Sequence, residues 1–169
     1  MPVDARTFRA AMGAFPTGVV IVTAVDPTGA PKGLTTQSFI SVSVDPPLLL
    51  LSLDKTSRTL RALLASKALV VNFLEGGRGD LATRFATKND DKFTGVVWRP
   101  SAIAKGSPVL AEDSVAYAEC LVERTIEAGD HLLVIASVEG GAVLPGTPLM
   151  YYRRTYAAWP EEHEAPISL

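Results

Sequence analysis

The stretch KGLTTQSFISVSVDPPLLLLSLDKTSRTLRALLAS, residues 32–66, holds the features that decide the fold. Its first half alternates hydroxyl-bearing and apolar side chains, which predicts a strand over residues 34–44. Two prolines follow, and the leucine run at 48–53 predicts a second strand that is buried on both faces. The polar run that comes next opens onto leucines at helical spacing, which predicts a helix over residues 57–66.

The rest of the chain extends this pattern of hairpin strands with a few short helices. Further strands are expected at 17–25, 67–74, 115–127, 131–140 and 149–159, and short helices at 4–15 and 80–88, capped by Asp4 and Asp80. Strands and helices do not alternate as a doubly wound parallel sheet requires. The pattern predicts a mainly β protein, an antiparallel barrel with short helices packed outside.

Composition limits the classes of protein that the chain can belong to. At 169 residues it is expected to form one domain over 1–169, with a core at about 8–157 and a mobile tail at 160–169. It is 47% hydrophobic and carries a net charge of −2 without a basic run, so nucleic-acid binding has little support. No apolar run is long enough to cross a membrane, and no signal peptide is recognisable. A lone Cys120 excludes an internal disulfide, and a cytoplasmic location is expected.

The run DKTSRT, residues 54–59, lies where a strand ends and a helix begins. The first turn of a helix exposes unpaired N–H groups and a partial positive charge, where a phosphate fits. Charge and hydroxyl donors come from Lys55, Thr56, Ser57, Arg58 and Thr59. The alternative is a well-capped helix with Thr56 or Ser57 as its cap and two solvated bases.

Two further features could contact a ligand. The run Thr35, Thr36, Gln37 and Ser38 places polar groups on both faces of its strand. It is either the wet outer face of an edge strand or a polar strip that contacts a flat heterocycle. His131 follows a tight turn at the start of a strand, where a histidine is usually a surface residue unless a ligand lies near.

Several familiar site motifs are absent from the chain. It has no dinucleotide-binding glycine motif after a strand, no Walker loop, no zinc-protease motif and no nucleophile elbow. Two histidines, one cysteine and no suitably spaced acidic cluster give no metal site. Any chemistry would therefore come from an organic cofactor.

The segments FPTGVVIVTA, SFISVSVDPPLLLLSLDKTSRT, LATRFA, GDHLLVIASV and PLMYYRRTY occur in the order found in a known family. From about Phe8 to Tyr156 the chain resembles the flavin reductase family, the NAD(P)H:flavin oxidoreductases with an FMN-binding split barrel. The resemblance implies a six-stranded antiparallel split barrel with flanking short helices, working as a homodimer. It also implies FMN or FAD and NADH or NADPH as cofactors, and a flavin-dependent monooxygenase as the partner that receives reduced flavin.

The resemblance also implies roles for individual residues. The flavin ring would lie along Thr35, Thr36, Gln37 and Ser38, and the ribityl phosphate along Ser52, Lys55, Thr56, Ser57 and Thr59, with Arg84 and Phe85 bordering the site. The nicotinamide would face Phe15, Thr17, His131 and Tyr156, with His131 positioning it for hydride transfer. Two departures from the family pattern are Gln37 and the pair Arg153 and Arg154.

Three alternatives stay open at this point. The protein could keep its FMN and act as an oxidase or reductase on another small molecule, since fold does not fix function. It could bind flavin as a sensor without catalysis. It could also be a structural barrel in which the polar run is an outer face and a helix cap.

Overall fold

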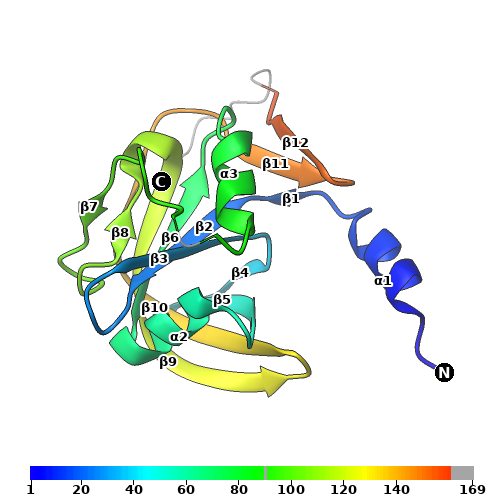
Figure 1. The fold of residues 1–169 in the computed structure, drawn as a ribbon, viewed down its shortest axis with the longest axis horizontal. Helices are drawn as coiled ribbons and strands as arrows, with labels where there is room; N and C mark the ends of the chain where they lie inside the picture. The colour runs from blue at the N-terminus through cyan, green and yellow to red at the C-terminus, as the bar shows by residue number, and fades with distance from the viewer. Residues whose placement is uncertain (90, 161–169) are drawn as a thin grey trace.

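The computed structural model describes residues 1–89 and 91–160, so the expected mobile tail lies, apart from Pro160, outside the described residues. In chain order its elements are α1 (Ala5–Met12), β1 (Thr17–Gly18), β2 (Val20–Val25), β3 (Pro31–Thr36), β4 (Phe39–Val44), β5 (Pro47–Asp54), α2 (Arg58–Ser66), β6 (Ala68–Leu74), α3 (Gly79–Ala86), β7 (Arg99–Pro100), β8 (Pro108–Val109), the short 3-10 helix η1 (Ala111–Asp113), β9 (Ser114–Ala128), β10 (His131–Val143), β11 (Leu149–Tyr152) and β12 (Thr155–Ala158) (Figure 1). The described part of the chain contains no helix long and apolar enough to cross a membrane.

The main sheet is antiparallel and has the strand order β3-β2-β6-β9-β10-β5-β4. The prediction of a mainly β fold is confirmed, but this sheet has seven strands where six were predicted, and its hydrogen-bond ladder is not closed into a barrel. Its two edge strands, β3 and β4, are joined only by Gln37 and Ser38. Three Cα–Cα steps span at most about 11 Å, so the sheet must curl until its two edges approach each other.

The prediction of one strand over residues 34–44 is wrong. The strand is interrupted at Gln37 and Ser38, where the chain crosses from one edge of the sheet to the other. At this crossing, local hydrogen bonds take the place of the hydrogen bonds between strands. The Ser38 amide donates to the Thr36 hydroxyl at 3.0 Å, and the Phe39 amide donates to the Gln37 carbonyl at 3.0 Å. A hydroxyl that captures a nearby amide competes with the sheet in this way.

The single strand predicted over 149–159 is a hairpin of β11 and β12, and β1 adds to it to form a small sheet. Its turn is made by Arg153 and Arg154, whose φ angles are 46° and 67°. Two consecutive residues with positive φ make the tight turn that matches the twist of paired strands. The two arginines thus serve the turn, and the Arg153 guanidinium lies 5.1 Å from the Tyr152 ring.

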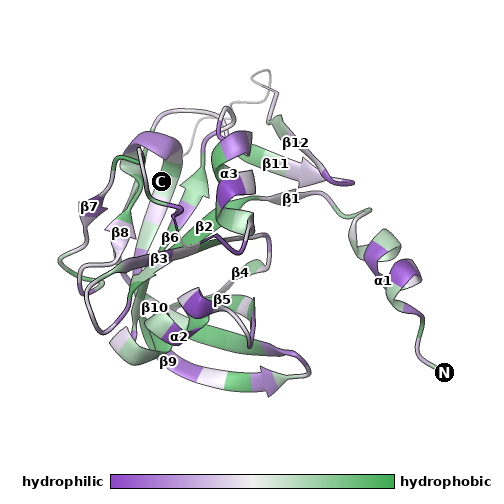
Figure 2. Ribbon diagram, in the orientation of Figure 1, coloured by the Kyte–Doolittle hydropathy of each residue, from purple (hydrophilic) through white to green (hydrophobic). Residues whose placement is uncertain are grey.

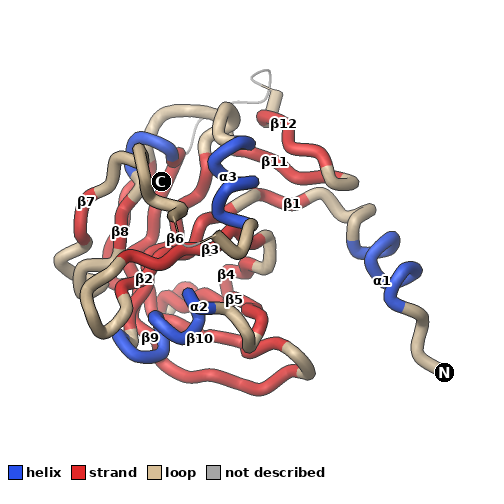
Figure 3. The backbone as a smooth tube through the Cα atoms, in the orientation of Figure 1, coloured by secondary structure: helices blue, strands red, loops and turns tan. Residues whose placement is uncertain are grey.

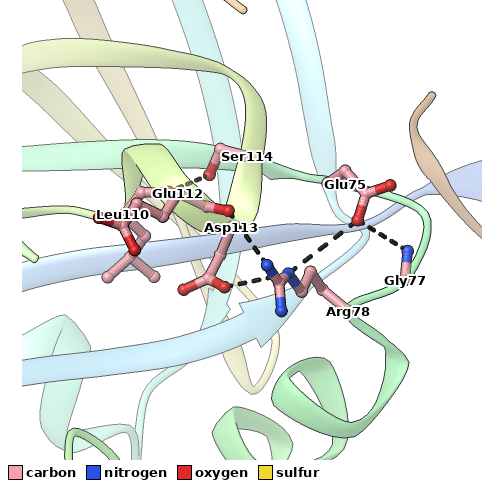
Figure 4. Close-up of polar contacts among 7 residues, drawn as sticks. All are labelled: Glu75, Gly77, Arg78, Leu110, Glu112, Asp113 and Ser114. Atoms are coloured by element: carbon pink, nitrogen blue, oxygen red, sulfur yellow. Dashed lines mark hydrogen bonds and ion pairs between the residues drawn. The ribbon is translucent and has the colours of Figure 1, made fainter. Parts of the chain in front are cut away.

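Helix α3 begins at Gly79, so the predicted cap at Asp80 is wrong; the cap position is Arg78, which makes no side-chain capping bond. Arg78 instead ties the start of the helix to η1. Its Nε lies 3.0 Å from the Asp113 carboxylate, and a guanidinium N–H donates to the Glu112 carbonyl at 3.2 Å (Figure 4). Burial raises the pKa of Asp113, and the charge of Arg78 offsets part of that rise.

The core has one large cluster between α2 and the curved sheet and a second beneath α3. Leu60 and Leu63 of α2 are 3% and 0% exposed, and each contributes about 1.5–3 kcal/mol by leaving water. Phe85 of α3 is fully buried in the second cluster with Leu110 and Leu149. Hydrophobic residues accordingly gather along β2, β5 and β6 (Figure 2).

Helix α1 follows the prediction, with Asp4 as its cap, since the Asp4 carboxylate accepts from the Thr7 amide at 2.8 Å. It stands away from the sheet, whereas α2 and α3 both lie beside β3 (Figure 3). None of its residues is buried, and Phe8 and Met12 are 55% and 57% exposed. The helix therefore contributes little to the core of this chain.

Candidate functional site

A cavity of about 610 Å³ opens between the two helices that flank β3. Its walls come from β3, the end of β5, the start of α2, the segment after α3, and the first residue of β10. Of the predicted site residues, the following line it: Thr35, Thr36, Ser38, Ser52, Thr56, Ser57, Thr59, Phe85 and His131. Two runs far apart in sequence, the polar strip and the helix start, thus face the same cavity.

The start of α2 supplies the wall at which an anion would bind. Ser57 is the N-cap, and its hydroxyl oxygen accepts from the Leu60 amide at 3.3 Å. Thr59 is buried in the first turn of the helix. The preceding Asp54 carboxylate accepts from the amide and the hydroxyl of Thr56 at 2.7 Å and 2.8 Å. The hydrogen bond from the Thr56 amide holds the pKa of Asp54 below its usual value and fixes the turn that leads into the helix.

The polar strip is tied to neighbouring elements by side-chain hydrogen bonds, with Thr35 and Thr36 half-buried and Gln37 and Ser38 exposed. The Thr35 hydroxyl donates to the Ala82 carbonyl of α3 at 2.7 Å, which holds that helix against β3. Gln37 lies outside the large cavity, and its side-chain oxygen accepts from the Thr17 hydroxyl at 2.8 Å. Thr35 and Thr36 remain in the cavity wall.

A second, smaller cavity of about 160 Å³ adjoins the first. It shares Thr35, Thr36 and Ala86 with the large cavity and adds Val19, Gln37, Tyr151 and Tyr156. The rings of Tyr151 and Tyr156 lie 5.0 Å apart, and burial raises the pKa of Tyr156. Tyr156, predicted to face nicotinamide, therefore lies beside the polar strip and lines the smaller cavity, whereas His131 lines the larger one.

His131 begins β10 beside the end of β5, and their register pairs it with Asp54. Its Nδ1 lies 2.7 Å from the Asp130 carboxylate, so the ring is oriented by its own neighbour in the chain. The hydrogen bond with His131 lowers the pKa of Asp130. With Nδ1 held by Asp130, Nε2 is the ring atom left for a ligand in the cavity.

Four predicted site residues line neither cavity: Lys55, Arg84, Phe15 and Thr17. The Lys55 ammonium pairs with Glu127 at 3.2 Å and does not line either cavity. Arg84 donates to the Thr94 carbonyl at 3.0 Å and Phe15 is 72% exposed, and neither lines a cavity. The places of these side chains depend on contacts between segments that are distant in sequence, which a local sequence pattern does not predict.

Sequence reasoning missed several basic residues of the cavity wall. They are Lys32, Arg61, Lys88 and Lys92, and Arg58 was noted only as a charge near the helix start. The Lys92 ammonium donates to the carbonyls of Gly33 and Phe85 at 3.0 Å and 2.8 Å, which closes the wall between β3 and α3. The clustering of Lys88 and Lys92 just after the α3 pattern was the available signal.

The arrangement suits a flat ligand that carries phosphate. A helix N-terminus, hydroxyls and several bases face an elongated cavity, whose lining is otherwise split between polar and apolar groups. Within the described ranges, no group of His, Cys, Asp and Glu side chains could hold a metal ion. The wall fits the phosphate, ribityl chain and ring of a flavin.

Comparison with known proteins gives a consistent result. Residues 12–160 match the family model described as "Flavin reductase like domain". A flavin reductase (NADH) of Kitasatospora aureofaciens is 48% identical over 164 residues, covering 96% of this chain and 85% of that protein. The reductase subunit HsaB of a flavin-dependent monooxygenase of Mycobacterium tuberculosis is 39% identical over 167 residues, covering 97% and 87%.

A solved structure agrees with these sequence matches. An NADH:FAD oxidoreductase of Streptomyces globisporus, in complex with NAD and FAD fragments, superposes with a TM-score of 0.87 at 30% identity, covering 97% of this chain and 99% of that one. The match to the family model and the two relatives span nearly the whole chain. The chain therefore belongs to the flavin reductase like domain family.

Proposed function

We propose that this protein is an NAD(P)H-dependent flavin reductase that supplies reduced FMN or FAD to a flavin-dependent monooxygenase. The observation that carries the proposal is a single cavity bounded by the N-terminus of α2, by Thr35, Thr36 and Ser38, and by His131. Family membership and the names of the relatives, a flavin reductase and a monooxygenase reductase subunit, support the same reaction.

In this proposal Ser57 and Thr59, with the amides of the first turn of α2, hold the flavin phosphate. Thr35, Thr36 and Ser38 border the ring. Phe85 is fully buried against β3 and lines the same cavity. Tyr156 and Thr17 lie toward the smaller cavity, on the side of the strip where a nicotinamide would approach. The described contacts of Lys55 and Arg84 give them structural roles outside this site.

A bound flavin supplies the chemistry, since its ring accepts a hydride from the reduced nicotinamide. The chain itself needs to hold two flat rings in contact, which is an effect of positioning. His131, with Nδ1 fixed by Asp130, can present Nε2 to the nicotinamide or to the ring. The Thr36 hydroxyl accepts from the Ser38 amide, so its own hydrogen can be donated to the electron-rich ring edge.

We also propose that two copies of the chain associate and that the protein acts in the cytoplasm. The outer face of the edge strand β4 exposes Ile40, Val42 and Val44, which are 57%, 49% and 93% exposed. Exposed apolar residues in a row on an edge strand are typical of a surface that another chain covers. Light scattering of the purified protein should give twice the 17.9 kDa chain mass, and a monomer would contradict this part of the proposal.

The first test follows nicotinamide absorbance in air with purified protein, NADH or NADPH, and added FMN, FAD or riboflavin. Oxidation that rises and saturates with free flavin is expected. Stoichiometric co-purifying flavin with no turnover of added flavin would favour an enzyme that keeps its FMN. Flavin binding with no nicotinamide oxidation would favour a sensor, and no flavin binding at all would refute the proposal.

The role of His131 is tested by His131→Ala beside Asp130→Asn, which leaves the ring but weakens its anchor. Both variants should raise the KM for nicotinamide or slow flavin reduction, with flavin affinity within about twofold of the parent. The expected loss in rate is about tenfold, the size of one lost positioning contact. If flavin affinity alone falls, His131 does not contact the nicotinamide.

A further inference from the structure

The large cavity runs along the whole length of β3. Its lining contains Pro31, Lys32, Gly33, Leu34, Thr35 and Thr36, that is, all of β3. At about 3.4 Å per residue these six positions span roughly 17 Å. The proposed ring site is at the Thr36 end, so the Pro31 end is the distal part of the cavity.

Three bases line this cavity in addition to Arg58 and Lys92. Lys32 lies on β3, Arg61 on α2, and Lys88 in the segment after α3, and all three line the cavity. Arg61 is four residues beyond the cap Ser57, which places it about 6 Å further along the axis of α2. The Arg58 guanidinium donates to the Lys88 carbonyl, so the segment that carries Lys88 is fastened beside α2.

The charge of Lys88 adds to the hydrogen bonds of Thr56 in lowering the pKa of Asp54, so one of these bases already acts on an acid of the cavity wall. Lys32 pairs with Asp26 at 3.4 Å, while neither the Arg61 nor the Lys88 side chain forms an ion pair or hydrogen bond with any described residue. Among the described residues that line the cavity, Asp54 is the one acid, and it is held by Thr56. A wall with several bases and one acid favours an anionic ligand.

Total charge does not distinguish FMN from FAD, because each carries about two negative charges near neutral pH. Their distribution differs, since FMN places both charges on one phosphate and FAD spreads them over two. A wall that offers one donor group at the helix start and a second about 6 Å further along matches two phosphates. The spacing of the bases, rather than their number, therefore carries the distinction.

We propose that Arg61 and Lys88, with Lys32 beside them, bind the second phosphate of a flavin adenine dinucleotide and make this chain select FAD over FMN. The inference rests on the proposed function and adds its flavin specificity. Arg61 and Lys88 are then specificity-determining residues, while the contacts of Ser57 and Thr59 are common to both flavins.

The test measures the dissociation constants of FAD, FMN and riboflavin by flavin fluorescence for the parent, Arg61→Gln, Lys88→Gln and the double variant. Arg124→Gln is the matched control, because Arg124 is an exposed arginine on β9 outside both cavities. The parent should bind FAD about tenfold more tightly than FMN, the gain from charge-assisted contacts to one further phosphate. The double variant should lose that gain and keep its FMN and riboflavin affinities, and the control should change none of them.

Equal affinity of the parent for FMN and FAD would overturn the inference and leave the proposed function intact. An equal loss of FMN and FAD affinity in Arg61→Gln would assign Arg61 to the first phosphate instead. Steady-state kinetics separate a further case. If the variants raise the KM for NADPH but not for NADH, with FAD affinity unchanged, the bases serve the 2′-phosphate of the nucleotide and the inference fails. Absence of binding for all three flavins would instead refute the proposed function itself.

Discussion

Ser57 has two roles that one pair of substitutions can separate, since it caps α2 and faces the phosphate end of the cavity. Ser57→Ala removes the hydroxyl that accepts from the Leu60 amide. Ser57→Asp restores a good cap, because aspartate ranks with serine at this position, but it adds a negative charge where the flavin phosphate is proposed to bind. Ser57→Asp should therefore be the more stable of the two variants and the one that binds FMN more weakly.

The stability change is set by the cap. Loss of one N-cap side chain costs about 1 kcal/mol, which in a chain of 169 residues lowers Tm by about 2–4 °C. Ser57→Asp should lie within about 1 °C of the parent or above it, since a carboxylate also interacts favourably with the helix N-terminus. Thermal unfolding without flavin measures both.

The affinity change is set by charge. Two unit charges about 4 Å apart interact by about 4 kcal/mol at the effective dielectric constant near a protein surface. Ser57 is half-buried and salt screens part of this, so a loss of between ten- and a hundredfold in FMN affinity is expected for Ser57→Asp. Ser57→Ala loses one hydrogen bond to a charged group, worth about 1.5–3 kcal/mol at most.

Riboflavin, which has no phosphate, is the internal control. Fluorescence titrations should show riboflavin affinity unchanged in both variants, and the FMN deficit of Ser57→Asp should shrink as salt is raised. If Ser57→Asp binds FMN as tightly as the parent at low salt, the flavin phosphate does not bind at the start of α2. A parallel loss of riboflavin affinity would mean that the substitution disturbs the wall rather than the charge.

Three other outcomes follow from the packing. Gly33→Ala places a Cβ 2.6 Å from the fully buried Phe85 ring and should lower the free energy of unfolding by about 1–3 kcal/mol, measured by urea denaturation. Burial raises the pKa of the Cys120 thiol to about 12, so at pH 8 a thiol reagent should react only as fast as the chain unfolds. Thr56→Val removes a hydroxyl already bound to Asp54 and should leave FMN affinity within about twofold, unlike Ser57→Asp; a loss as large as that of Ser57→Asp would contradict the assignment.

Apolar runs and helical spacing predicted most elements: β5 and β6 are short, nearly continuous apolar runs, and α2 has leucines at helical spacing. The break at Gln37 and Ser38 was not predictable from that pattern. The Thr36 hydroxyl and a two-residue crossing between sheet edges interrupt the strand within the polar run Thr35–Ser38, which was interpreted as part of one strand. The curvature that brings the two edges of the sheet together depends on all seven strands, so a short stretch of sequence cannot predict it.

The site was predictable to the extent that it lies next to a strand end or a helix start. Ser57 and Thr35 were predicted from hydroxyls at a helix start and within a strand, and His131 from its place after a tight turn; all three line the cavity. Lys88 and Lys92 come from a segment without periodicity, and their place in the wall depends on bonds to α2, β3 and α3. The position of Lys55 outside both cavities was not predictable for the same reason, because its partner, Glu127, comes from the β9–β10 hairpin.

The hydroxyls between residues 35 and 59 divide according to where their hydrogens go. Those of Thr35 and Thr56 are donated inside the protein, to the Ala82 carbonyl and to the Asp54 carboxylate, so toward a ligand these two residues can only accept. Ser57 and Thr36 accept from backbone amides and keep their own hydrogens for donation. The first pair fixes the walls of the cavity by joining β3 to α3 and β5 to α2. The second pair can then meet a phosphate at one end and a ring carbonyl at the other, which is the division of polar groups that a flavin requires.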